Sequence, residues 1–236
     1  MIQIENLYKK FGKNQVLSNL DLDIHGNGIF AVLGPNGSGK TTLIKCILGM
    51  VVPSSGEIQV QGSTIKKNWK YRREINYLPQ IANFPGNLKV KELIRMIKDL
   101  RQMDSKEEDL IRLFALNPFL DKKLSTLSGG TKQKVNIVLT FMFDSPLIIL
   151  DEPTTGLDPG SLIKLKELLL QEKSKGKTIL ITTHIMQFVE EMSDEIVYLL
   201  EGNIFFKGNV EQLKAKTNQT DFEHAIAAIA TQMSDA

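Results

Sequence analysis

The stretch that decides the fold is IFAVLGPNGSGKTT, residues 29–42. Its first part, IFAVLG, is continuously apolar, which is typical of a strand buried on both faces of a sheet. GPNGSGKT follows, with four residues between two glycines and then Lys40 and Thr41, and residues 40–50 have a helical pattern. A strand, a glycine-rich turn and a helix are the context that a phosphate-binding loop requires, so we predict an α/β fold with a P-loop core.

The residue types in this loop fit a nucleoside triphosphate. Glycines let the backbone wrap a phosphate chain with amide hydrogens pointing inward, and the helix N-terminus adds positive potential. Lys40 can reach the β and γ phosphates, and Thr41 can bind Mg²⁺. The alternative is a glycine-rich turn with a lone lysine, but a chance match in a chain of this length occurs on the order of one time in a hundred.

Working outward, the apolar pattern predicts an α/β core that an all-helical insert interrupts. Residues 2–7 and 20–24 alternate between apolar and polar side chains, as half-buried strands do. Residues 90–114 carry apolar side chains at helical spacing, and no strand is evident between residues 81 and 144. Further elements are predicted as strands at 56–62, 74–78, 147–150 and 178–182, helices at 159–175 and 185–193, and a hairpin over 196–206. Residues 214–236 read as a helix, or as a helix with a frayed tail.

Composition and charge exclude several classes of protein. The 236 residues are 42 % hydrophobic and 24 % charged, which is ordinary globular usage and not that of a disordered chain. The net charge of +2 argues against nucleic acid as a partner of the whole surface. The single cysteine, Cys46, cannot form an internal disulfide and is expected to be a buried small apolar residue in a reducing compartment. The longest apolar runs have strand length, and no secretory signal precedes them, so we expect a cytoplasmic protein.

An apolar strand, LIIL at residues 147–150, delivers two carboxylates, Asp151 and Glu152. Successive side chains of a strand point to opposite faces, so the two acids are expected to have different roles. Asp151 can lie beside a metal ion while Glu152 accepts a proton from an attacking water. The alternative, an exposed turn with two acids, would be favoured if no P-loop were present.

LSGGT, residues 127–131, precedes an apolar helical pattern. Ser128 is a good helix N-cap, and by itself this interpretation is favoured. The second interpretation is another anion site, because a Ser-Gly-Gly helix start offers a hydroxyl and bare amides to a phosphate.

Together these segments resemble the ATP-binding cassette of ABC transporters: GPNGSGKT, LSGGT and LIILDE occur in that family's order. LSGGT resembles the family's signature, Gln80 its Q-loop glutamine, Asp158 its D-loop aspartate and His184 its switch histidine. Phe11 matches the aromatic residue that stacks on adenine. The resemblance implies catalytic roles for Lys40, Gln80, Glu152 and His184, and metal ligands at Thr41, Gln80 and Asp151. It implies nucleotide contacts at Phe11, Val16, Gly34, Asn36, Gly37, Ser38, Gly39, Lys40, Thr41, Thr42, Ser128, Gly129, Gly130 and Asp158.

The resemblance also implies an architecture and partners. The fold would be a RecA-like P-loop NTPase core with an antiparallel β subdomain over residues 1–80 and 145–213. The α-helical signature subdomain would span residues 81–144, and residues 214–236 would form a C-terminal helix or tail. Two copies would dimerise head to tail around two ATP and Mg²⁺, and would drive a separate membrane permease from the cytoplasmic face of the inner membrane. The segment LSGGTKQK and the compact helical insert are similar to those of export-type and ABC-2-type cassettes, including those serving copper-enzyme maturation.

Alternatives remain for the secondary positions and for the function. Gln80 could be a polar loop residue, His184 a structural histidine and Phe11 a core aromatic, in which case Tyr8 would be the adenine candidate. Thr131 stands where the family most often has Gln, and activity is expected to survive this departure because Ser128 and Gly130 are present. A soluble ABC ATPase not coupled to transport is the first rival function. Another P-loop enzyme, such as a GTPase or small-molecule kinase, would not explain LSGGT, and a non-catalytic module would not need Lys40, Asp151, Glu152 and His184.

Two further segments have open interpretations. Phe84, in the loop after Gln80, either anchors a helix of the permease or packs beneath the helical insert. The basic stretch with Lys66, Lys67, Lys70, Arg72 and Arg73 is favoured as a solvated face over a nucleic-acid site.

Overall fold

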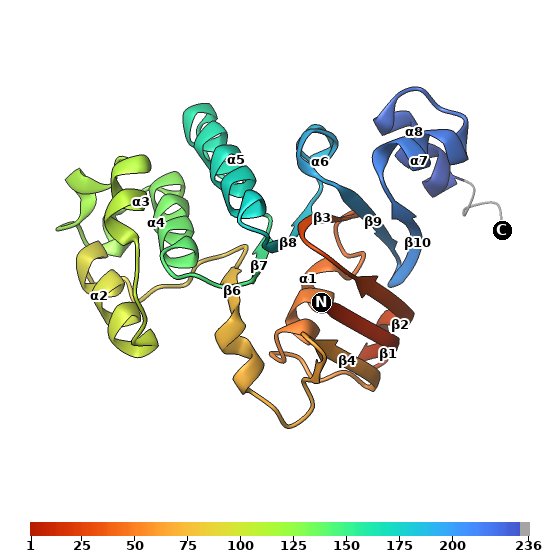
Figure 1. The fold of residues 1–236 in the computed structure, drawn as a ribbon, viewed down its shortest axis with the longest axis horizontal. Helices are drawn as coiled ribbons and strands as arrows, with labels where there is room; N and C mark the ends of the chain where they lie inside the picture. Colours follow the sequence, from red (N-terminus) through yellow and green to blue (C-terminus); the bar gives the residue numbers. More distant parts are fainter. Residues whose placement is uncertain (232–236) are drawn as a thin grey trace. The chain divides into compact units, whose positions relative to one another are not determined.

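The computed structural model describes residues 1–231 (Figure 1). The chain divides into two compact units. Unit 1 comprises Met1–Arg73 and the chain from Thr178 onward, and unit 2 comprises Glu74–Lys177. The subdomain boundaries expected from the sequence stay a prediction.

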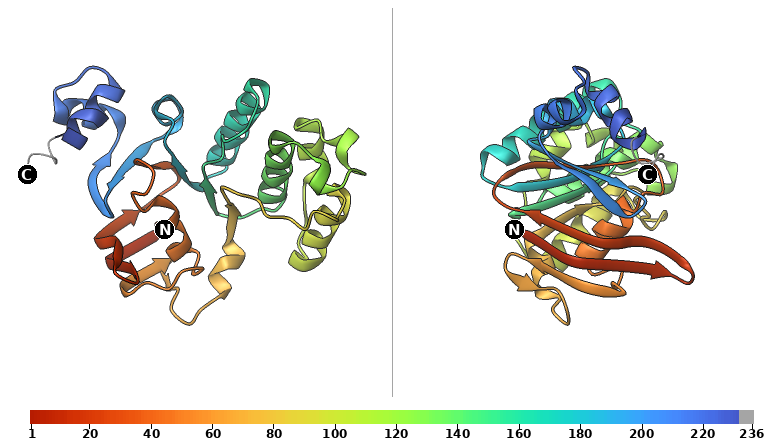
Figure 2. Two further views of the ribbon diagram at one scale, coloured as in Figure 1. Left: turned by 180° about the vertical axis from the view of Figure 1, so that it is seen from behind. Right: turned by 90° about the vertical axis from the view of Figure 1, so that its right-hand side faces the viewer.

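Unit 1 contains an antiparallel sheet with the strand order β2-β1-β4-β5. Its strands are β1 (Ile2–Phe11), β2 (Asn14–Ile24), β4 (Ser55–Val60) and β5 (Ser63–Thr64), and the long β1–β2 hairpin is red in Figure 2. The alternating pattern is confirmed, because Ile4 pairs with Leu22 and both side chains are buried. The register shifts after Ile4, where Asn6 adopts a left-handed φ of 48°, a conformation that asparagine tolerates better than most residues.

The second sheet of unit 1 carries the stretch that decided the fold. In it, β3 (Gly28–Leu33) lies between β8 (Thr178–Thr183) and β9 (Glu195–Leu200) and is parallel to both. Every residue of β3 and β8 is buried, and for β3 the continuous apolar run predicted this burial. β9 turns into β10 (Asn203–Gly208) through the predicted hairpin.

Two short helices follow strands of this sheet. α1 (Lys40–Ile47) follows β3, and α6 (Met186–Met192) follows β8. α1 ends before the predicted Met50 because Gly49 takes a left-handed φ of 64°. Cys46 lies buried in α1, as expected, and burial raises the pKa of its thiol to about 11 although Lys9 acts in the opposite sense.

The C-terminal residues form two helices where one was expected. α7 (Val210–Thr217) ends at Asn218, whose φ of 53° breaks the helix, and α8 (Phe222–Thr231) follows. Phe222 and Ile226 of α8 pack in one apolar cluster with Ile196 of β9 and Phe206 of β10. The part of the expected tail over residues 232–236 lies outside the described residues.

Unit 2 pairs two parallel strands with four helices. The strands are β6 (Ile75–Leu78) and β7 (Leu147–Asp151). The helices are α2 (Val90–Arg101), α3 (Glu107–Leu113), α4 (Gly129–Phe141) and α5 (Pro159–Ser174), of which α2 to α4 run from yellow to green in Figure 1. The helical pattern over residues 90–114 is broken at Gln102, which has a φ of 50°. Over residues 81–144, all of which the structure describes, there are two isolated bridges and no strand.

No helix within residues 1–231 combines the length and the apolar content needed to cross a bilayer. The longest, α5, has 16 residues, whereas a spanning helix needs about twenty apolar ones.

A buried carboxylate, Glu172, fastens the end of α5 within unit 2. It accepts hydrogen bonds from Lys106 (2.7 Å), Lys175 (2.8 Å) and Lys177, and Lys177 also donates to Asp144. Burial by itself raises the pKa of Glu172, but the three lysine hydrogen bonds outweigh it and lower the pKa from 4.5 to about 2. The ionised carboxylate therefore stabilises the folded state.

Glu172→Gln should lower the free energy of unfolding by about 3 kcal/mol, because it leaves buried ammonium groups without their shared charge. The folded pKa of Glu172 lies below its ordinary value, so its contribution is complete above pH 4.5 and is lost as the pH falls through about 2. Urea unfolding at about pH 7 and about pH 3 should thus show a smaller difference from wild type at the lower pH. Glu167→Gln, at an exposed position of the same helix, is the matched control and should change little.

Candidate functional site

The P-loop, residues 34–41, needs its three glycines for two reasons. A Cβ on Gly34 would lie 2.0 Å from the carbonyl oxygen of Leu199 in β9, so no side chain fits there. Gly37 and Gly39 have left-handed φ values of 83° and 108°. The loop therefore turns tightly at the carboxyl end of β3 and feeds directly into α1.

Polar groups line this turn. The Nζ of Lys40 donates to the carbonyl oxygens of Gly34 (2.7 Å) and Pro35 (3.0 Å), which holds the ammonium across the loop. Ser38 is buried, and its Oγ has no hydrogen-bond partner within residues 1–231. A buried hydroxyl without a partner, a bare helix N-terminus and a nearby ammonium fit a bound phosphate chain. Asn36 is exposed at the tip of the loop, and Thr41 and Thr42 are half-buried in the first turn of α1.

Two other predicted site residues of unit 1, Val16 and His184, lie near the P-loop. A Cβ on Gly39 would lie 3.0 Å from the carbonyl oxygen of Val16, so the Val16 backbone closes one side of the loop. Thr183 pairs with Leu33, so exposed His184 follows β8 at the edge of the sheet where the P-loop begins.

Phe11 ends β1 and is 49 % exposed, with the Nζ of Lys9 at 4.6 Å from its ring centroid. The alternative that Phe11 is a core aromatic is therefore wrong. Phe11 is thus more exposed than Tyr8, the second candidate, which is half-buried.

In unit 2, the two predicted carboxylates end β7 in a buried position. Asp151 is 1 % exposed and Glu152 is 4 % exposed, so the alternative of an exposed acidic turn is wrong. Glu152 has a left-handed φ of 50°, a strained conformation for a non-glycine residue and one that recurs at functional sites. Leu78 pairs with Leu150, which places exposed Gln80 at the same edge as these acids. Burial, and then the charge of Asp151, raises the pKa of Tyr77 to about 12.

The signature segment, residues 127–131, begins α4. Ser128 is its N-cap, with the backbone N–H of Thr131 donating to Ser128 Oγ at 3.3 Å, so the capping interpretation is confirmed. The Thr131 hydroxyl lies 2.9 Å from the same Oγ. The sequence pattern did not reveal this second contact. Ser128 and Gly129 are exposed, which leaves the helix start accessible to an anion.

The first turns of α4 contact the segment that follows Glu152, a link that the sequence analysis missed. Gln133 donates to the carbonyl oxygen of Pro153 at 3.0 Å, and Lys134 pairs with Asp158 at 2.7 Å. A Cβ on Gly130 would lie 2.7 Å from the carbonyl oxygen of Gly156. The only signal in the sequence was the polar run Lys132 to Lys134 at the start of this helical pattern.

Asp158, predicted as a nucleotide contact, caps α5 by accepting from the backbone N–H of Ser161 at 2.8 Å. The hydrogen bond from Lys134, followed by those from Ser161, holds the pKa of Asp158 well below its usual range. In this structure Asp158 thus orders the start of α5, and its contact with nucleotide stays a prediction.

A P-loop follows the buried parallel strand β3, and two acidic residues stand at the end of another parallel strand, β7. These features define an α/β nucleotide-binding protein. Residues 17–155 match the ABC transporter family. The uncharacterized ABC transporter ATP-binding protein YhaQ of Bacillus subtilis (strain 168) is 32 % identical over 219 residues, covering 91 % of this chain and 73 % of that protein. The Nod factor export ATP-binding protein I of Rhizobium meliloti (strain 1021) is 34 % identical, covering 90 % of this chain and 65 % of that protein. The chain therefore belongs to the ABC transporter family, as an ATP-binding subunit.

Solved structures agree with this assignment. An ATP-binding subunit of an ABC transporter superimposes with a TM-score of 0.90 at 28 % identity, covering 98 % of this chain and 99 % of that one. The dimeric structure of MJ0796, a bacterial ABC transporter cassette, has a TM-score of 0.81 at 26 % identity, covering 89 % and 98 %. The predicted P-loop NTPase fold is confirmed.

Lys40→Ala should weaken ATP binding strongly, because it removes a charge-assisted contact worth about 1.5–3 kcal/mol. Titration calorimetry with ATP measures the loss. Lys45→Ala, an exposed lysine on the same helix, is the matched control and should bind ATP as the wild type does. Equal affinity for the Lys40 variant and the wild type would contradict the assignment of the P-loop.

Proposed function

We propose that this chain hydrolyses ATP as one of two identical subunits, arranged head to tail, that drive a separate membrane permease. The observation that carries the proposal is the buried, strained Glu152 directly after Asp151, in a chain of the ABC family. A left-handed backbone at a buried non-glycine residue is strained, and such strain recurs at functional sites, so this position supports a catalytic role for Glu152.

Each predicted residue has a role in this reaction. The P-loop amides and Lys40 bind the phosphates, and Thr41, Gln80 and Asp151 would hold Mg²⁺. When bound, the ion neutralises charge on the β and γ oxygens. Glu152 accepts a proton from the water whose oxygen attacks the γ phosphorus, while the bond from that phosphorus to the bridging oxygen of ADP breaks. His184, beside the start of the P-loop, orients the γ phosphate and this water.

The dimer is supported by the accessible start of α4. Ser128, Gly129 and Gly130 of one copy would contact the γ phosphate held by the P-loop of the other. The similar cassette MJ0796 has been solved as a dimer, and also as a dimer in a post-hydrolysis state with ADP and phosphate. ATP would thereby complete the interface, so binding drives closure and hydrolysis releases it.

An export-type permease is supported by the names of the relatives. Besides the Nod factor export protein, the lantibiotic transport ATP-binding protein SrtF of Streptococcus pyogenes is 32 % identical, covering 88 % of this chain and 90 % of that protein. An ABC-2-type permease, or one serving copper-enzyme maturation, would fit the compact helical insert. Such a chain would act at the cytoplasmic face of the inner membrane.

Glu152→Gln keeps the size and hydrogen bonding of the side chain but removes the base. ATP turnover should fall by roughly 10² to 10⁴ while ATP still binds. The ATP-loaded dimer should then accumulate, which gel filtration with and without ATP can measure. Full turnover by a monomeric variant would contradict both the base and the dimer.

Phe84→Asp tests docking of the permease. Phe84 is half-buried, and Ile81, three residues before it in the same loop, is largely exposed. A partner can therefore contact Ile81 without any change in the packing of Phe84. The variant should retain ATP binding while the permease no longer copurifies with a tagged chain from membranes. Ile81→Asp is the companion variant, because it can remove the contact without disturbing the fold.

A large fall in the melting temperature of Phe84→Asp, together with normal copurification by Ile81→Asp, would assign Phe84 to packing beneath the insert. If the wild type itself copurifies with no membrane protein, the rival function, a soluble ABC ATPase, is favoured.

A further inference from the structure

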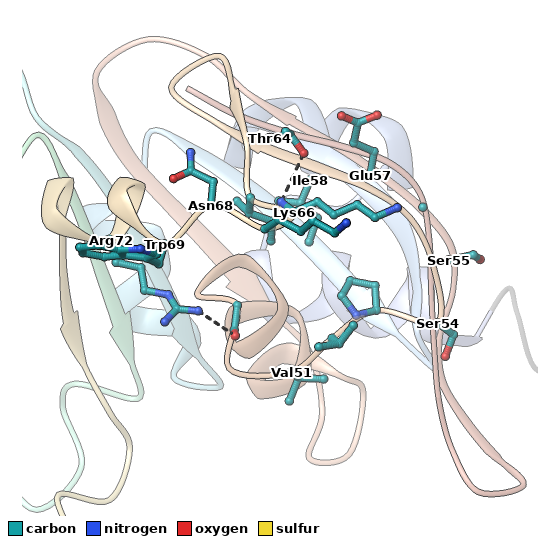
Figure 3. A pocket seen from close by; sticks show the side chains of 16 residues that line it. Val51, Ser54, Ser55, Glu57, Ile58, Thr64, Lys66, Asn68, Trp69 and Arg72 are labelled. Carbon is teal, nitrogen blue, oxygen red and sulfur yellow. Dashed lines mark hydrogen bonds between the residues drawn. The ribbon is translucent and has the colours of Figure 1, made fainter.

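A pocket of about 610 Å³ lies in unit 1, beyond the C-terminal end of α1 (Figure 3). Trp69 and Arg72 line one side, and Ser55 and Glu57 lie on the opposite side. The P-loop lies at the other end of α1, eight residues or about 12 Å away along the helix axis. The pocket is therefore separate from the nucleotide site of the same unit.

Two hydrogen bonds hold the side of the pocket that contains Trp69 and Arg72 against the end of α1. The hydroxyl of Tyr71 donates to the carbonyl oxygen of Ile47 at 3.0 Å, and the guanidinium of Arg72 donates to that of Gly49 at 3.0 Å. These two bonds satisfy carbonyls at the end of the helix. Tyr71 is buried, so the segment is a fixed wall and not a loose loop.

Exposed apolar side chains gather around this pocket. Within residues 1–73 and 178–231, five large apolar side chains are exposed, and two of them line the pocket: Val52 (77 %) and Trp69 (58 %). A third, Met50 (61 %), lies between the lining residues Gly49 and Val51 in the sequence. Single exposed apolar residues are normal, but a group that includes the only tryptophan of the chain is unusual. Water is a poor environment for this group.

Cations surround the same apolar group. Lys66, Lys67, Lys70, Arg72 and Arg73 lie within eight residues, and Arg73 stacks over the Trp69 ring at 5.4 Å. The acidic residue nearest to this basic stretch in the sequence is Glu74, and the acidic residue in the pocket wall is Glu57. Lys66, Lys67 and Lys70 form no ion pair with any residue of the described chain. Their charge is available to an anionic partner.

We propose that this surface docks on a bilayer that contains anionic phospholipid. Lys66 and Lys67 contact the headgroup phosphates, while Trp69 and Val52 enter the interfacial layer, where tryptophan and long basic side chains are favoured. An exposed tryptophan and valine with flexible lysines around them fit a lipid surface better than one acidic protein segment. The contact needs no permease, so it goes beyond the proposed function.

The sole tryptophan makes the proposal directly measurable. The purified full chain is mixed with vesicles of pure phosphatidylcholine, or of phosphatidylcholine with about a third phosphatidylglycerol. Anionic vesicles should shift the Trp69 emission to shorter wavelength and carry the chain down in sedimentation. Added salt should weaken both effects, because it screens the cations. Unchanged emission with anionic vesicles, or equal binding to both lipids, would overturn the proposal.

Lys66→Glu together with Lys67→Glu should reduce binding to the anionic vesicles by about tenfold or more. Lys122→Glu with Lys123→Glu, an adjacent exposed pair in unit 2, changes the net charge equally and should bind as the wild type does. Both variants should hydrolyse ATP normally without vesicles, which shows that they fold. Equal losses for the two pairs would mean a general charge effect and overturn the assignment. If the first pair binds vesicles normally but loses a permease purified in detergent, the surface docks protein and the lipid proposal is wrong.

Discussion

The close approach of Gly34 to the carbonyl oxygen of Leu199 constrains the whole nucleotide-binding half of unit 1. No Cβ fits at this point, where the buried strand β3 must turn at once into the P-loop. Because β3 lies between two parallel neighbours, its carboxyl end is fixed in position. The amides of the loop, the start of α1 and the ammonium of Lys40 therefore have defined places before any phosphate arrives, which lowers the entropic cost of binding.

The buried carboxylates of unit 2 show two uses of the same chemical group. Glu172 is surrounded by lysines that donate to it, and its lowered pKa is a contribution to folding. Glu152 is equally buried but lies on a strained backbone at a strand end, next to another acid. Backbone strain of this kind recurs at functional sites, which supports the proposed role of Glu152.

The start of α4 connects two motifs that are far apart in the sequence. Gln133 and Lys134 join the signature helix to the segment after Glu152, and Gly130 allows the backbone of that segment to approach. A displacement of α4 would therefore change the contacts of residues 153–158. Within unit 2, these contacts connect the helix start that would contact a partner's nucleotide to the segment that follows the proposed base.

Sequence alone determined the parts of this protein that depend on local pattern. The buried strand, the glycine-rich turn and the helix of residues 29–47 follow from hydrophobicity and backbone freedom, and the two acids after residue 150 follow from a strand end. Tertiary structure decided what local pattern does not encode. It buried Asp151 and Glu152, left Phe11 exposed at a hairpin end, and paired Lys134 with Asp158.

The tertiary structure also divided two segments into separate helices, residues 90–114 at Gln102 and the residues after 209 at Asn218. Both residues have left-handed backbone angles, which end a helix even where the apolar pattern continues. The sequence showed the basic stretch but not its position beside Val52, because two hydrogen bonds from Tyr71 and Arg72 to the end of α1 bring that stretch to the pocket. Periodicity reports which face of an element is buried. Which elements meet is set by packing between distant segments, and that is a property of the folded chain.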